Sequence, residues 1–235
     1  MEVAPNAARE IASRLTEKGW LDRLFPGAYL IILLAAGEKS MYTTHEHLIA
    51  AHVAEPMYIG YYSALSHHGL TEQVPRIVYV VTPTRAQSRE IHGVPYRVTT
   101  VTGRKFFGTE PTSVEGTTVK ISDLEKTLVD CADHPDFCGG IRELANAVRA
   151  ADEQGCTWET VGEYLGRLDN GAAIKRIVYL ADQFGIDLPT REALVASFTS
   201  DYSPLDPTRP QTGSTDSTYC FQVNVEPAML EPAES

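Results

Sequence analysis

The sequence predicts an α+β fold, because helical and strand patterns occupy different parts of the chain. The first 36 residues have the pattern of one helix followed by a β-hairpin. Between residues 76 and 121, strand-like runs follow one another at spacings too short for parallel crossovers, which predicts a mainly antiparallel sheet. From residue 122 onwards, apolar residues recur at helical spacing and predict a C-terminal helical portion.

Composition and charge limit the function classes. The chain has 235 residues, of which 43% are hydrophobic, enough for one domain with a small appendage. A formal net charge of -11 excludes a surface built as a whole to bind nucleic acid or an acidic membrane. The longest apolar run, residues 28–36, falls far short of the roughly 20 residues of a membrane span. Four cysteines without a CxxC pair and no signal-peptide pattern favour the cytoplasm.

Residues 1–36 are predicted to form a small N-terminal module. Asn6 is the expected N-cap of its helix, and Gly19 the expected end. Four apolar residues share one helix face at i, i+3, i+4 and i+7: Ala8, Ile11, Ala12 and Leu15. Strand-like residues 20–24 and 28–34 flank a turn at residues 25–27. A helix followed by a tight hairpin corresponds to the second half of a winged helix-turn-helix, so we expect a partial winged-helix module.

The polar face of this helix is the candidate DNA-reading surface. In a winged helix, the recognition helix enters the major groove and the hairpin reaches the DNA backbone. Asn6, Arg9 and Ser13 suit base contacts, because arginine pairs with guanine and asparagine with adenine. Arg14 and Arg23 are candidates for phosphate contacts. The same residues also fit an ordinary amphipathic helix packed on a hairpin, and this alternative stays open.

A larger domain is predicted over residues 42–225, after a short polar linker, and residues 226–235 are predicted to be a disordered acidic tail. The expected helices are 44–54, 60–68, 123–133, 140–151, 157–168, 172–184 and 190–197. The expected strands are 76–81, 91, 94–101, 106–107, 117–121 and 219–225, with a loop at 199–218. Ser122 and Glu125 form an S-x-x-E pattern, which predicts a capping box at the start of the helix 123–133.

Charge is distributed unevenly along this domain. From Arg76 to Lys105 there are six basic residues and one acidic residue, whereas residues 151–235 carry fourteen acidic and five basic residues. Arg76, Arg85 and Arg89 are therefore candidate anion-binding residues. The alternative is that these arginines are solvated strand ends.

The sequence offers no convincing catalytic or metal-binding set. His45 and His52 share a helix face, but they lie about 10 Å apart along the axis, too far to bind one ion. Ser63 and His67 lack the orienting carboxylate and oxyanion donors that acyl transfer requires. We therefore expect no metal, no cofactor and no enzymatic activity.

Several longer motifs resemble the AbiEi family of antitoxins and transcriptional regulators of type IV toxin-antitoxin systems. The longest is YIGYYSALSHHGLTEQ at residues 58–73. Further similar motifs are RIVYVVT (76–82), SDLEKTLVD (122–130), Lys175-Arg176 with Tyr179-Leu180, and, in the hairpin, residues 19–21 and 26–29. The resemblance covers nearly the whole chain.

The resemblance implies a cytoplasmic antitoxin whose N-terminal winged helix represses its own operon and whose larger C-terminal domain provides antitoxicity. The implied partners are the operator DNA and a nucleotidyltransferase-like toxin, and direct contact with that toxin is not implied. Family members have two further helices before the recognition helix, whereas Met1 here lies five residues before Asn6. We therefore expect either a start further upstream or a member that acts through its C-terminal domain.

Two alternatives from other functional classes stay open. One is an enzyme that modifies nucleotides or the toxin and uses the basic segment 76–105 to bind anions. The other is a protein-binding module without DNA binding, whose acidic C-terminal helices meet a basic partner.

Overall fold

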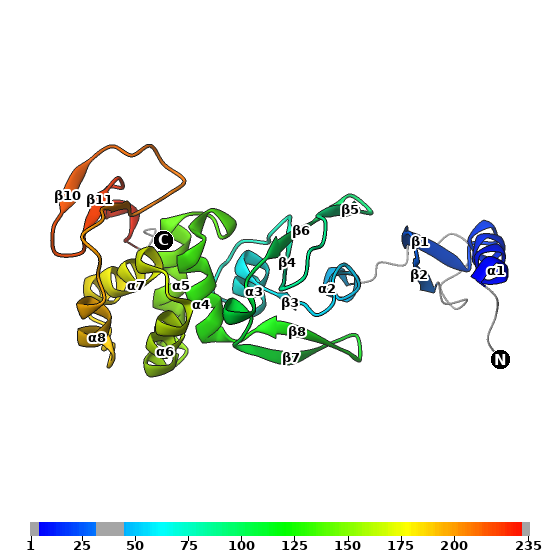
Figure 1. Ribbon diagram of the computed structural model, residues 1–235, viewed down its shortest axis with the longest axis horizontal. Coiled ribbons are helices and arrows are strands. Elements are labelled where there is room, and N and C mark those ends of the chain that lie inside the picture. The colour runs from blue at the N-terminus through cyan, green and yellow to red at the C-terminus, as the bar shows by residue number, and fades with distance from the viewer. Residues whose placement is uncertain (1–4, 32–44, 232–235) are drawn as a thin grey trace.

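The computed structural model describes residues 5–31 and 45–231 (Figure 1). Its helices and multistranded sheet confirm the α+β class. Figure 1 shows α1 with the β1–β2 hairpin at one end, the helices α5–α8 towards the other end, and the main sheet between them. No helix in the described ranges is long and apolar enough to cross a bilayer.

The N-terminal residues form a helix and a hairpin. Helix α1 spans Pro5–Glu17, and strands β1 (Leu21–Phe25) and β2 (Ala28–Ile31) pair antiparallel. The helix ends where expected, since Gly19 has φ +72° and the Trp20 N–H donates to the Leu15 carbonyl at 2.9 Å. The N-cap prediction was wrong, because Pro5 is already helical and Asn6 lies inside the first turn. Proline is favoured there because it lacks a backbone N–H, and N–H groups in the first turn of a helix have no partner within the helix.

The main sheet has six strands in the order β5-β6-β4-β3-β8-β7. Their bounds are β3 Tyr58–Ile59, β4 Val78–Thr82, β5 Arg89–Ile91, β6 Val94–Thr100, β7 Thr109–Val114 and β8 Thr117–Ser122. The pairs β4–β6 and β3–β8 are parallel, and the other three pairs are antiparallel. The sheet is therefore mixed, with antiparallel pairs in the majority.

Two of these strands were missed in the sequence, and one predicted strand was wrong. Strand β3 has two residues, both fully buried, so it shows no alternation. Strand β7 is polar and contains Pro111, which an edge strand tolerates because one side of its backbone is unpaired. Residues 106–107 are not a strand, since they follow the 3-10 turn η2 (Gly103–Lys105), and Phe107 packs edge-on against Tyr164.

The helices of the larger domain follow the predicted order. Their bounds are α2 Glu46–Ala50, α3 Tyr61–His67, α4 Leu124–Asp133, α5 Ile141–Glu153, α6 Trp158–Leu168, α7 Gly171–Phe184 and α8 Arg191–Ala196. The 3-10 turn η3 (Pro135–Phe137) follows α4. The predicted capping box was wrong: Asp123 is the N-cap and accepts from the Lys126 N–H at 2.7 Å. Glu125 instead accepts from the Thr157 N–H at 3.0 Å, which joins α4 to the start of α6.

The C-terminal segment is more ordered than the sequence predicts. The expected loop 199–218 contains β9 (Ser203–Pro204) and β10 (Ser214–Asp216), which form a small sheet with β11 (Phe221–Val223). The 3-10 turn η4 (Pro227–Met229) follows, and Leu230 is buried with its carbonyl accepting from Arg149. The predicted tail 226–235 is therefore packed as far as Leu230, while residues 232–235 lie outside the described residues.

Helix α4 carries charged groups into the core. Lys126 is fully buried and donates to Asp130, one turn further on, which also accepts from the Tyr58 hydroxyl at 2.9 Å. The Lys126 ammonium lies 4.7 Å from the centre of the Phe107 ring. Burial raises the pKa of Asp130, and the charge of Lys126 acts in the opposite direction. The pair is thus enclosed by aromatic rings and satisfied by hydrogen bonds, as a buried ion pair requires.

Replacing Lys126 tests this contribution to stability. Lys126→Met keeps the side-chain length and leaves Asp130 buried without its cation, so we expect the free energy of unfolding to fall by about 3 to 5 kcal/mol. Urea denaturation measures the change. The exposed Lys120 of β8 provides the control, and Lys120→Met is expected to change stability by less than about 0.5 kcal/mol. Equal stability of the two variants would show that the buried pair is dispensable.

Candidate nucleic-acid interface

An open hollow lies between α1 and the β1–β2 hairpin. Helix α1 contributes small and polar side chains to its wall, and the hairpin contributes Arg23, Tyr29 and the turn residues Pro26 and Gly27. The lining residues from the helix are Ala8, Arg9, Glu10, Ala12, Ser13, Thr16 and Glu17. The hollow therefore combines a polar helix face with the tip of a hairpin.

Three of the five predicted DNA-binding residues meet in this hollow. Arg9 and Ser13 reach it from the helix, and Arg23 reaches it from β1. Arg14 is exposed but does not line the hollow, and the Asn6 side chain lies outside what the structure describes. Glu10 and Glu17 offset the charges of the two lining arginines, so any DNA contact here depends on individually placed side chains rather than on net charge.

The predicted apolar face of α1 is only partly buried. Ile11 retains 41% of its exposure, and Ala8 and Ala12 line the hollow instead of a core. The i, i+3, i+4 spacing predicted the helix correctly. The helix packs on the hairpin through β1, as the alternative of an amphipathic helix packed on a hairpin expects.

The outer face of the hairpin packs on the larger domain. Asp22 forms an ion pair with His92, with 3.1 Å between Oδ2 and Nε2. The Arg89 guanidinium lies 4.7 Å from the centre of the Phe25 ring. Leu24 and Phe25 also contact the hydrophobic cluster formed by α2 and one face of the main sheet. The sequence reveals neither the ion pair nor the contact of Arg89 with Phe25, because each joins residues more than 60 positions apart.

The candidate anion-binding arginines fall at two different places. Arg76 is exposed before β4, and Arg85 is exposed after it, so the five residues of that strand, at about 3.3 Å each, separate the two. Arg89 lies on β5 and is held over Phe25. The strand register places Arg89 level with Val78, at the end of β4 where Arg76 lies and away from Arg85. The three residues therefore do not form one anion-binding floor.

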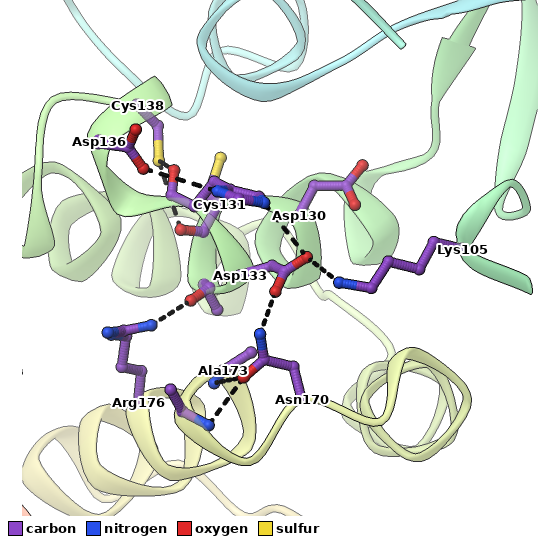
Figure 2. Close-up of polar contacts among 12 residues, drawn as sticks. Lys105, Asp130, Cys131, Asp133, Asp136, Cys138, Asn170, Ala173 and Arg176 are labelled. Carbon is purple, nitrogen blue, oxygen red and sulfur yellow. Dashed lines mark hydrogen bonds and ion pairs between the residues drawn. The ribbon is translucent and has the colours of Figure 1, made fainter. Parts of the chain in front are cut away.

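A second polar cluster surrounds the C-terminal end of α4, and Figure 2 shows Asp133 at its centre. Lys105 donates to Asp133 Oδ2 at 2.7 Å, and Asn170 donates to its other oxygen. Asn170 also caps α7, since its Oδ1 accepts from the Ala172 N–H at 2.9 Å. The Arg176 guanidinium donates to the Ala132 carbonyl at 2.9 Å.

These contacts give the Asp133 cluster a structural role, because they connect three elements. Asp133 is 5% exposed, and both of its oxygens accept from nitrogen donors of other elements. His134 lies 3.7 Å from both Asp133 and Asp136, too far for hydrogen bonds. The cluster thus fastens η2 and α7 to α4.

The histidines at the junction of α2 and α3 form a third cluster. The ring centres of His45 and His47 are 4.7 Å apart, and those of His47 and His67 are 6.3 Å apart. Burial and the neighbouring His45 and His67 lower the pKa of His47 to about 4. Within residues 5–31 and 45–231, no group of three or more His, Cys, Asp or Glu residues has a metal-binding arrangement.

Comparisons with known proteins bear on the fold. No family model matches the chain, and no curated protein matches it. The crystal structure of the RV2827C protein from Mycobacterium tuberculosis is similar, with a TM-score of 0.63 and 17% sequence identity over 93% of this chain and 79% of that chain. At this identity the likeness shows a common fold and nothing about activity.

The histidine cluster predicts a pH-dependent stability. The pKa of His47 is 6.5 in the unfolded chain and about 4 in the folded protein, so the unfolded state binds the proton more tightly. The contribution of His47 to stability is therefore fully present above pH 6.5. It is lost as the pH drops towards 4, by about 3 kcal/mol in total. Urea denaturation at pH 7 and pH 4.5 measures this loss.

Two glutamine variants distinguish the contribution of His47 to this pH dependence from that of other groups that titrate in the same range. His47→Gln is expected to remove most of the pH dependence, whereas His52→Gln, at an exposed position, is expected to leave it unchanged. An unchanged pH dependence in His47→Gln would contradict the assignment.

Proposed function

We propose that the protein is a DNA-binding transcriptional regulator that contacts its operator through α1 and the β1–β2 hairpin. The observation that carries this proposal is the convergence of Arg9, Ser13 and Arg23 on the open hollow between helix and hairpin tip. In this reading α1 is the recognition helix and the hairpin is the wing of a winged helix.

The side chains in the hollow suit distinct parts of a DNA duplex. Arg9 has the fork of donors that pairs with guanine O6 and N7 in the major groove, and the Ser13 hydroxyl both donates and accepts. Arg23, on the hairpin, suits a backbone phosphate, and Arg14 offers a further cation on the exposed surface of α1. The near-neutral lining favours specific over purely electrostatic binding.

The antitoxin half of the proposal rests on the sequence resemblance to the AbiEi family. In that view the larger domain, residues 45–231 of the structure, provides antitoxicity against a nucleotidyltransferase-like toxin, and the protein has its site of action in the cytoplasm. The protein is then a regulator without catalytic activity of its own.

A gel shift on the promoter of its own operon tests DNA binding. Wild-type protein is expected to shift this fragment, and Arg9→Ala is expected to lose about 1 to 3 kcal/mol of binding free energy because a base contact disappears. The loss is expected to relax sequence preference at one base pair. Arg142, exposed on α5 far along the chain, is the matched control, and Arg142→Ala is expected to bind like wild type.

Either of two outcomes would contradict the regulator. The first is no shift at low salt, and the second is an equal loss of affinity in Arg9→Ala and Arg142→Ala.

The antitoxin half has a separate test in growing cells. Co-expression with the nucleotidyltransferase-like protein encoded beside it is expected to restore growth, and Arg76→Ala and Arg85→Ala variants are expected to protect as well as wild type. Loss of protection in these two variants would instead favour an enzyme that uses the basic segment 76–105. Failure of the wild-type protein to protect would refute the antitoxin role and leave the DNA-binding role standing.

A further inference from the structure

Two acids share the hollow of the N-terminal module with its two arginines. Glu10 and Glu17 of α1 line the hollow, and both are exposed. Neither is among the residues that form ion pairs in the described part of the chain. A carboxylate repels the phosphates of DNA, so these acids lower the affinity that Arg9 and Arg23 provide. If they serve the DNA-binding surface, they serve selectivity rather than affinity.

Helical spacing places Glu10 among the residues that contact bases in the proposed function. Ser13 follows Glu10 at i+3, about 4.5 Å further along the helix axis, and Glu17 follows at i+7, about 10 Å further along. The three side chains therefore share one face of α1. Arg9 immediately precedes Glu10, and it lines the same hollow. Of the two acids, Glu10 is the one that lies beside Arg9.

The two acids differ in their position along the helix. A recognition helix contacts base edges mainly through residues of its N-terminal part. Glu10 lies in the first half of α1, whereas Glu17 is the last residue of the helix. A duplex that places a base edge at Arg9 therefore also brings base edges to Glu10, and Glu17 lies beyond them.

The chemistry of a carboxylate selects among these base edges. An ionised carboxylate can only accept hydrogen bonds. In the major groove, guanine presents two acceptors, and thymine presents an acceptor and a methyl group. Adenine presents a donor next to an acceptor, whereas cytosine presents the N4 amino donor alone. Cytosine is therefore the base that suits Glu10 best.

We infer that Glu10 determines sequence specificity by accepting a hydrogen bond from the N4 amino group of an operator cytosine, near the base pair that Arg9 contacts. The inference rests on the proposed function, because it requires α1 in the major groove. Repulsion between Glu10 and the phosphates weakens binding to all DNA, and a cytosine at this position compensates for the loss. Binding to other sequences is thus disfavoured.

Selection from a pool of random-sequence duplexes tests this inference on the full-length protein. Wild-type protein is expected to enrich a motif with one C·G pair whose replacement weakens binding roughly tenfold. Glu10→Gln removes the charge and keeps the side-chain length and helix propensity. Because glutamine pairs with adenine N6 and N7, this variant is expected to enrich adenine in place of that cytosine, with the rest of the motif unchanged.

Glu17→Gln is the matched control. It makes the same chemical change on the same exposed face, at the last residue of α1. This variant is expected to enrich the wild-type motif with the cytosine retained. A change of preference confined to Glu10→Gln then assigns the cytosine to Glu10 rather than to the general charge of the helix.

The possible results separate the inference from the proposed function. If Glu10→Gln enriched the wild-type motif, or if both variants bound all sequences more tightly with no change of motif, the inference would be overturned and the proposed function would stand. A change in Glu10→Gln at a position where wild type selects a base other than cytosine would also overturn the inference. Failure of wild-type protein to enrich any motif would overturn both.

Discussion

Helix α4 is the element on which the rest of the larger domain depends, because it brings two acids and a lysine into an apolar interior. Buried charges are costly unless they are paired and hydrogen-bonded. Lys126 and Asp130 satisfy each other with the help of Tyr58 from β3, while Asp133 accepts from Lys105 of η2 and from Asn170 at the start of α7. Asp130 has all its partners only when α4 packs on the sheet, and Asp133 only when η2 and α7 pack against α4, which ties these elements into one unit.

This requirement has a consequence for the candidate DNA-binding surface. The same sheet that β3 joins to α4 carries the β5–β6 hairpin at its far edge. That hairpin contacts the β1–β2 hairpin through an ion pair and a cation–π contact, each worth roughly 1 kcal/mol or less at exposed positions, and Leu24 and Phe25 add apolar packing. The larger domain thus holds the small N-terminal module through a few side-chain contacts, and the position of the β1–β2 hairpin depends on the far edge of the sheet.

Sequence patterns predict most of the helices, and they fail where tertiary contacts determine the local structure. The helices α3 to α8 have sustained periodicity and recognisable ends, such as Gly69 after α3. The two-residue β3 and the polar edge strand β7 carry no such pattern, and the N-cap of α4 moved from Ser122 to Asp123. For the candidate site, helical spacing predicted Arg9 and Ser13 on one face. The role of Arg89 against Phe25 requires the folded chain and could not be predicted.

Hydrogen–deuterium exchange of the full-length protein with and without operator DNA tests the central claim most directly, since it locates the bound duplex on the chain. The account predicts slower amide exchange in residues 5–31 on DNA binding, with the helices α5 to α7 unaffected. Protection confined to α5–α7, or absent from residues 5–31, would contradict it.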